Sequence, residues 1–205
     1  MSRQYVNPAG LRRDGRRPHE IRRLRCRFNP VGSCDGSAYL EHGCNKIIAV
    51  VRGPRALASR AQGQFDRATV KCTYTQAPFA KTEHRKIRSR DRRTEQIAAS
   101  IQKTFESVIQ THLYPRSEIS IEIQVLQSDG GAVSSAINAT TLALFDAGIP
   151  CTDYVVSFTI IKYVRYQDNR KRATCSVLIG GNACCSSFFC SFLTSINCSN
   201  ISKII

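Results

Sequence analysis

The three residues Asp129-Gly130-Gly131 have the types and the spacing that could bind a phosphate group. An apolar run, residues 118–126, precedes them, and residues 132–146, which are rich in Ala, Ser and Thr, follow. Paired glycines before a helix let backbone N–H groups approach an anion closely. No Lys, Arg or His, however, lies between Arg116 and Lys162. The pattern indicates either a phosphate site without its cation or a plain turn, in which Asp129 is favoured as a turn-forming residue over an acid.

A second group of candidate phosphate ligands precedes a predicted helix. From Thr94 onward an apolar stripe at helical spacing marks this helix, formed by Ile97, Ile101, Phe105, Val108 and Ile109. With Asp91 or Thr94 as its cap, Arg92 and Arg93 lie at the positive end of the helix dipole, which costs about 0.3–1 kcal/mol per charge. The placement becomes favourable when a phosphate docks there. The alternative interpretation of the charged run 80–96 is a solvated linker.

Positive charge is concentrated in the first half of the chain. The 205 residues carry a formal net charge of +15. Residues 1–110 hold 23 basic and 9 acidic side chains, whereas residues 111–205 hold 7 and 6. Such asymmetry predicts a polyanionic partner for the first half, and nucleic acid is favoured. The alternative is charge that serves only to keep the surface solvated.

The other elements are predicted from alternation and turn residues. Runs at 21–28, 37–43 and 46–54 are separated by turns, and they predict an antiparallel meander in which Ile21, Leu24, Cys26 and Phe28 face the core. Further strands are expected at 68–79, 118–126 and 153–161, with an exposed loop at 55–68. A helix over 132–146 should stop before Gly148 and Pro150.

The cysteines argue against a metal site and against disulfides. Without a secretory signal at the N-terminus, the ten cysteines are expected to be reduced thiols in the cytosol or nucleus. Five of them crowd the last 31 residues, yet their spacing lacks the paired pattern of a zinc site. We therefore predict no metal, and the chain has no apolar run long enough to span a membrane.

The character of the sequence changes after Ile161. We divide the chain into a basic N-terminal arm at 1–20, a folded domain at 21–161 and a Cys/Ser-rich tail at 162–205. The tail has no clear period, so no helix is predicted in it. An altered reading frame, a retained intron or a splice variant would explain the abrupt change.

Four motifs, taken in order, resemble the ribonuclease PH family. They are RRDGRRPHEIR (12–22), DGSAYLEHGCNKIIAVVRGP (35–54), HLYPRSEISIEIQVLQSDGG (112–131) and NATTLALFDAGIP (138–150). Within the family they are most similar to the eukaryotic exosome ring subunit that is equivalent to the archaeal catalytic ring subunit. The resemblance covers about residues 10–160 and implies an α+β fold, with mixed and antiparallel sheets and packed helices, that is truncated or altered at its C-terminus. Six such domains form a ring around a channel for single-stranded RNA.

The resemblance also implies that catalysis has been lost. Active members degrade RNA from its 3′ end with inorganic phosphate, which a Thr-Arg pair after the glycines binds. Here Ala132-Val133 follows Gly130-Gly131 and offers no charge. The acidic pair of active members would fall beyond Ile161, where the resemblance has ended, and Asp168 is not assigned to it. We therefore expect no catalytic residue, no cofactor and no metal.

RNA contacts are the function that the resemblance leaves in place. It places them on the loop at 57–64, with Ser59 and Arg60, and on Arg92 and Arg93, and the path could extend over Lys86, Arg88 and Arg90. The implied partners are single-stranded RNA, other ribonuclease PH-like exosome subunits, cap subunits and an associated hydrolytic nuclease, in the nucleus, nucleolus and cytoplasm. Two alternatives remain: an active phosphate-dependent 3′–5′ exoribonuclease, and a truncated variant that does not assemble.

Overall fold

A computed structural model describes residues 11–12, 14–17, 20–56, 65–84, 91–164 and 172–180, with residues 160–164 and 172–180 as backbone only. Five strands form one sheet in the order β1-β2-β3-β5-β4. They are β1 (Leu24–Phe28), β2 (Gly36–His42), β3 (Asn45–Ala56), β4 (Thr69–Gln76) and β5 (Ser117–Gln127). The first three form the predicted antiparallel meander, and β3 pairs antiparallel with β5. Only the β4–β5 pair of this sheet is parallel, with Thr69 opposite Glu118 and Gln76 opposite Val125.

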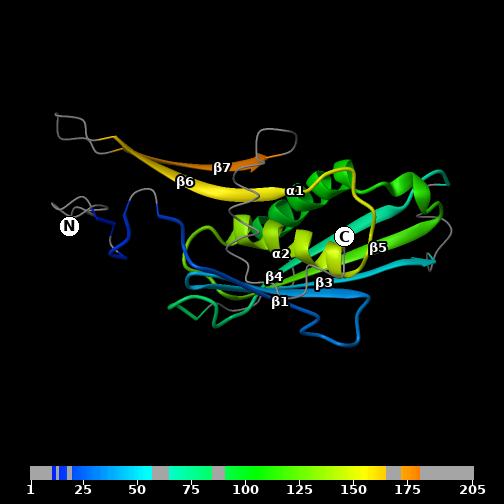
Figure 1. The fold of residues 1–205 in the computed structure, drawn as a ribbon, viewed down its shortest axis with the longest axis horizontal. Coiled ribbons are helices and arrows are strands. Elements are labelled where there is room, and N and C mark those ends of the chain that lie inside the picture. Colours follow the sequence, from blue (N-terminus) through cyan, green and yellow to red (C-terminus); the bar gives the residue numbers. More distant parts are fainter. Residues whose placement is uncertain are drawn as a thin grey trace.

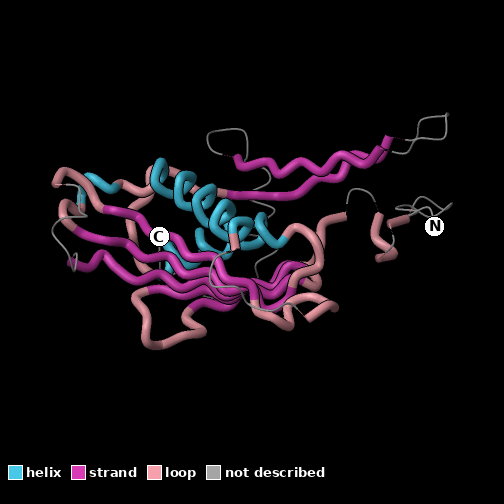
Figure 2. The backbone as a smooth tube through the Cα atoms, turned by 180° about the vertical axis from the view of Figure 1, so that it is seen from behind, coloured by secondary structure: helices cyan, strands magenta, loops and turns pink. Residues whose placement is uncertain are grey.

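Two helices cover one face of this sheet, as Figure 1 and Figure 2 show. The first, α1 (Arg92–Val108), packs against the edge strand β4, and a 3-10 turn at Thr111–Leu113 follows it. The second, α2 (Ala132–Asp146), lies across β2 and β3. None of the helices in the described part of the chain has the length and apolar character needed to cross a bilayer.

The core lies between the sheet and the helices, as the alternation predicts. Ile119, Ile121, Ile123 and Val125 of β5 are at most 1% exposed, and β3 contributes Ile47 and Val51. From α1, Ile101 and Phe105 fill the space above β4 and β5. Each fully buried apolar side chain of this size stabilises the fold by about 1.5–3 kcal/mol. The predicted α+β arrangement is therefore confirmed at the level of its core.

Two expectations differ from the structure. Ile21 was expected to face the core, but it is 57% exposed and precedes β1. The side chain of the neighbouring Arg22 is hydrogen-bonded to the turn after β5, and β1 begins only at Leu24. Beyond the domain, β6 (Val156–Val164) continues past residue 161 and pairs with β7 (Arg172–Gly180), a strand that the aperiodic tail did not predict. The boundaries at 20 and 161 themselves stay predictions.

Gly36 allows β2 to touch α2. A Cβ atom at this position would lie 2.4 Å from the backbone N of Ala147 and 2.5 Å from the carbonyl O of Ala143. The next residue continues the contact, because the N–H of Ser37 donates to a carboxylate oxygen of Asp146 over 2.9 Å. Only glycine is small enough for this approach of strand and helix.

We predict that Gly36→Ala destabilises the chain by at least about 1–3 kcal/mol, because overpacking forces β2 away from α2. Gly32→Ala is the matched control, since a Cβ there meets nothing within 4 Å, and it should change stability by less than about 0.5 kcal/mol. Urea unfolding of the full chain measures both values. Equal stabilities of the two variants would show that the strand–helix contact is looser than described.

Candidate functional site

The glycine turn predicted as a phosphate site joins the end of β5 to the start of α2. Gly130 and Gly131 have φ values of 72° and 74°, a left-handed conformation that favours glycine. Gly131 is the N-cap residue of α2, and no side chain caps the first turn of this helix. The geometry therefore keeps the open helix start of an anion site. The next two side chains, Ala132 and Val133, are half-buried and bring no polar atom to it.

The side-chain amide of Asn45 holds this turn in place. Asn45 is fully buried at the start of β3. Its Nδ2 donates to the carbonyl O of Gly130 over 2.7 Å, and its Oδ1 accepts from the N–H of Asp129 over 2.7 Å. Both hydrogen-bonding functions of the amide are thus used on the backbone of two consecutive residues, Asp129 and Gly130. Asp129 lies in the turn, as predicted.

A guanidinium group also reaches the turn, from 107 residues away in sequence. Nη1 of Arg22 donates to the carbonyl O of Asp129 over 3.1 Å and to that of Gly130 over 3.0 Å. The sequence next to the turn contains no cation, as stated above, but a cation that is distant in sequence lies beside it. Arg22 and Asn45 were missed as site residues, although both fall within the motifs that carry the resemblance. The carbonyls that Nη1 binds lie on the turn itself, so this nitrogen fixes the turn.

Three hydroxyl groups and a histidine surround the start of α2. The Oγ atoms of Ser134 and Ser135 donate to the carbonyl O of Gly131, and Ser134 also pairs with Oγ1 of Thr159. Nδ1 of His42 lies 3.0 Å from Oγ of Ser135. Burial, together with the charges of Arg22 and Arg16, lowers the pKa of His42 to about 4. The imidazole is therefore neutral at pH 7.

Arg92 and Arg93 are the first two residues of α1, and both are exposed. Asp91 is the N-cap residue, as predicted, and its Oδ1 accepts from the N–H of Arg93 over 3.3 Å. The hydroxyl of Thr94 donates to the carbonyl O of Asp91. The pair thus stands at the positive end of the helix dipole, where an anion would be stabilised.

The arginine pair and the glycine turn lie at the same end of the sheet. The N–H of Ala68, before β4, donates to the carbonyl O of Thr111, so the region after α1 lies beside the start of β4. The start of α1 therefore lies beside the end of β4, and β4 runs parallel to β5. The glycine turn follows the end of β5. The structure thus brings Arg92 and Arg93 to the same end of the sheet as the glycine turn.

The other predicted RNA contacts lie outside the described residues. These are Ser59, Arg60, Lys86, Arg88 and Arg90. The residues that flank 57–64 are described: Ala56 ends β3, and Phe65 precedes β4. This end of the sheet is opposite to the glycine turn. The acidic pair of active family members was expected beyond the last side chain that the structure describes, so its loss stays a prediction.

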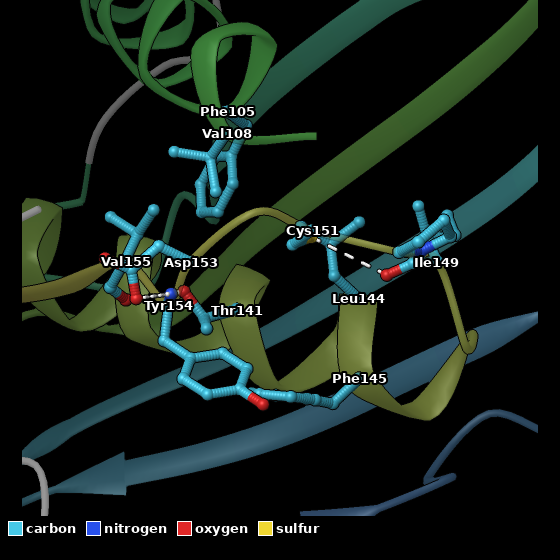
Figure 3. A pocket seen from close by; sticks show the side chains of 11 residues that line it. Phe105, Val108, Thr141, Leu144, Phe145, Ile149, Cys151, Asp153, Tyr154 and Val155 are labelled. Atoms are coloured by element: carbon cyan, nitrogen blue, oxygen red, sulfur yellow. Dashed lines mark hydrogen bonds between the residues drawn. The ribbon is translucent and has the colours of Figure 1, made fainter. Parts of the chain in front are cut away.

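A pocket of about 230 Å³ lies away from this site, between α1, the second half of α2 and residues 149–155 (Figure 3). Phe145 and Tyr154 close one side with ring centroids 4.6 Å apart. None of the predicted site residues lines this pocket. In the part of the chain that the structure describes, no group of three His, Cys, Asp or Glu side chains could hold a metal ion.

Residues 20–150 match the model of the 3′ exoribonuclease family, domain 1, known as RNase PH. The chain belongs to this family. The exosome complex component RRP41 of Homo sapiens is 43% identical over 153 residues, which are 74% of this chain and 62% of that protein. The homologue of Arabidopsis thaliana is 47% identical over 155 residues, 75% of this chain and 64% of that protein. The chain therefore spans less than two thirds of the length of these relatives.

Two further comparisons agree with this membership. The exosome complex component SKI6 of Saccharomyces cerevisiae is 40% identical over 166 residues, 80% of this chain and 68% of that protein. The crystal structure of rice Rrp46 superimposes with a TM-score of 0.65 at 22% identity, covering 94% of this chain and 97% of that chain. At this identity the likeness shows the fold, and the ribonuclease PH-like α+β fold is confirmed.

Protonation of His42 should be visible in the pH dependence of stability. The pKa is about 4 in the folded chain against a usual value of 6.5, so only the unfolded state gains a proton between these values. Stability therefore falls as the pH drops from 6.5 toward 4, by on the order of 3 kcal/mol from this group. The His42→Gln variant should lack this contribution to the pH dependence of the free energy of unfolding. Free energies of unfolding at pH 7 and pH 4.5 test it, and parallel profiles for both proteins would contradict a buried neutral imidazole.

Proposed function

We propose that the chain is a non-catalytic, RNA-binding ring subunit of an RNA exosome. The observation that carries this proposal is the glycine turn. Its backbone is kept and is anchored by Asn45 and Arg22, yet the residues that follow it are Ala132 and Val133. Assembly in an exosome is supported by the relatives at 40–47% identity, which are named as exosome components.

The absence of phosphorolysis follows from what this chemistry requires. An attacking phosphate must be neutralised and aimed at the scissile bond by groups fixed beforehand. Methyl and isopropyl groups at positions 132 and 133 can do neither. Nη1 of Arg22 binds two carbonyl oxygens of the turn, so it acts on the backbone. The shape of the turn, fixed by Arg22 and Asn45, then serves the fold.

RNA binding is supported by the exposed arginines at the start of α1. Arg92 and Arg93 present two exposed guanidinium groups at the positive end of the α1 dipole, which together suit a phosphate. Contacts of this kind are independent of base sequence and weaken with salt. A subunit that lines an RNA channel needs binding of this type, because every transcript has to pass.

In this role the chain works with other proteins. The proposed partners are other ribonuclease PH-like subunits, cap subunits and a separate hydrolytic nuclease that cuts the RNA. The proposed processes are 3′–5′ RNA processing, including rRNA processing, and mRNA decay. The proposed compartments are the nucleus, nucleolus and cytoplasm.

A second candidate is an active phosphate-dependent 3′–5′ exoribonuclease. Two observations favour it: the start of α2 has no side-chain cap, and the Arg22 guanidinium lies beside the turn. A third possibility is a variant that does not assemble. Purification of the complex through a tag on the full chain tests it. The two experiments below separate these functions.

The purified complex should release no nucleoside diphosphate from single-stranded RNA when inorganic phosphate is added. A tag on the full chain recovers the complex, and mass spectrometry identifies its subunits. Several different ribonuclease PH-like subunits with a hydrolytic nuclease support the proposal. Phosphate-dependent release of diphosphates by an assembly of this chain alone would establish the second candidate. Recovery of the chain without any partner would favour the variant that does not assemble.

Replacing Arg92 and Arg93 with Gln should weaken RNA binding in a salt-dependent way. The slope of log K against log salt is negative, and each lost phosphate contact reduces its magnitude by about 0.7 for single strands. The magnitude of the slope should therefore be about 1.4 smaller for the double variant. Fluorescence anisotropy with labelled RNA at several salt concentrations measures the slope. The matched control replaces Arg25 and Arg27, two exposed arginines of β1 at the other edge of the sheet, and should keep the wild-type slope. Equal slopes for both double variants would remove Arg92 and Arg93 from the RNA path.

A further inference from the structure

Phe65 is an exposed aromatic residue that precedes β4. Its side chain is 71% exposed, the largest value among the exposed large apolar residues of the described chain. The guanidinium carbon of Arg116 lies 5.4 Å from the centroid of the Phe65 ring. This is the geometry of a cation–π pair, in which a planar cation covers a ring. One residue of the pair comes from the segment before β4 and the other from the segment before β5.

The backbone of Arg116 adopts an unusual conformation at this point. Its φ of 58° lies in the left-handed region, where residues other than glycine are uncommon. Arg116 is itself exposed, and the next residue begins β5. A non-glycine residue held in this region is a reason to look for a function there. Here the result is a guanidinium group that lies against an exposed ring.

An unpaired nucleic-acid base is the ligand that fits this pair. A base can stack on an aromatic ring without regard to its identity, and an arginine adds a positive charge for the adjacent phosphate. The net charge of +15 on the chain complements such a polyanion. A protein partner would bury the same ring, but it has no comparable need for the positive charge.

Phe65 and Arg116 lie at the opposite end of β4 and β5 from the proposed phosphate contacts. Phe65 and Arg116 lie where β4 and β5 begin, whereas Arg92, Arg93 and the glycine turn lie where these strands end. The eight residues of β4 rise about 3.3 Å each, so the two ends are about 25 Å apart. Phe65 also directly follows the segment 57–64, on which RNA contacts were predicted from the sequence. A strand of RNA held at both ends would run along the edge strand β4.

We propose that Phe65 and Arg116 form a stacking platform for an unpaired base of single-stranded RNA, on the sheet end opposite to Arg92 and Arg93. The inference rests on the proposed RNA-binding function and adds a contact that uses the base. Phosphate contacts alone do not distinguish RNA with bases from an abasic strand. A stacking platform binds RNA that carries bases more tightly than an abasic strand, and this difference makes the proposal testable.

The experiment uses the complex purified through the full chain, with two fluorescent probes: oligouridine and an abasic ribose-phosphate strand of the same length. Phe65→Ala should weaken binding of oligouridine at least about fivefold. It should leave binding of the abasic strand and the salt slope unchanged. Phe65→Tyr should keep wild-type binding. Arg116→Gln should weaken both probes and lower the salt slope by about 0.7. Leu113→Ala removes another apolar side chain, 50% exposed, near the same sheet end, and should change neither probe.

The outcomes separate this inference from the function on which it rests. If the wild-type complex binds neither probe, RNA binding itself fails. If the wild type binds oligouridine and Phe65→Ala binds it equally well, the platform is overturned while RNA binding stands. Loss of a subunit from the Phe65→Ala complex would identify the ring as a protein contact and would also overturn the platform. Because Phe65 is exposed, its replacement should leave the fold intact, which the thermal unfolding curve checks.

Discussion

The two hydrogen bonds of the Asn45 amide connect parts of this domain that lie 84 and 85 residues apart in sequence. They join the start of β3 to the turn between β5 and α2. A buried amide left without partners costs about 1–3 kcal/mol for each unpaired group, so the turn has little freedom to move. The position of α2 over β2 and β3 follows, because the helix begins directly after Gly131. Arg22 then ties the segment before β1 to the same carbonyl groups.

Much of the secondary structure could be predicted from local patterns. The bounds of α2 agree at both ends, because Gly131 precedes the helix and Gly148 and Pro150 follow it. The alternation of β5 correctly gave its buried face, since each Ile faces the helices and each polar neighbour faces away. What alternation does not specify is the neighbour of a strand. The insertion of β5 between β3 and β4 depends on contacts across the chain, which periodicity does not report.

The candidate site was harder to predict than the fold for the same reason. The turn itself is a local feature, and its glycines were identified from their spacing. Its anchors Arg22 and Asn45 come from 84 to 108 residues away and act through side-chain contacts with backbone carbonyl and N–H groups. Such contacts leave no periodic trace in the sequence. The pair of Phe65 and Arg116 was missed because the ring and the cation approach each other only when β4 and β5 are side by side.

Among the described strands, β1 and β4 are the two edges of the five-stranded sheet, each hydrogen-bonded on one side only. Exposed edges invite pairing with the edge of another molecule, and charged side chains along them discourage it. Arg25 and Arg27 are exposed on β1, and Lys71 is exposed on β4. The basic surface therefore has a further consequence: like charges along the two edges disfavour the addition of one copy of the chain to another, strand to strand.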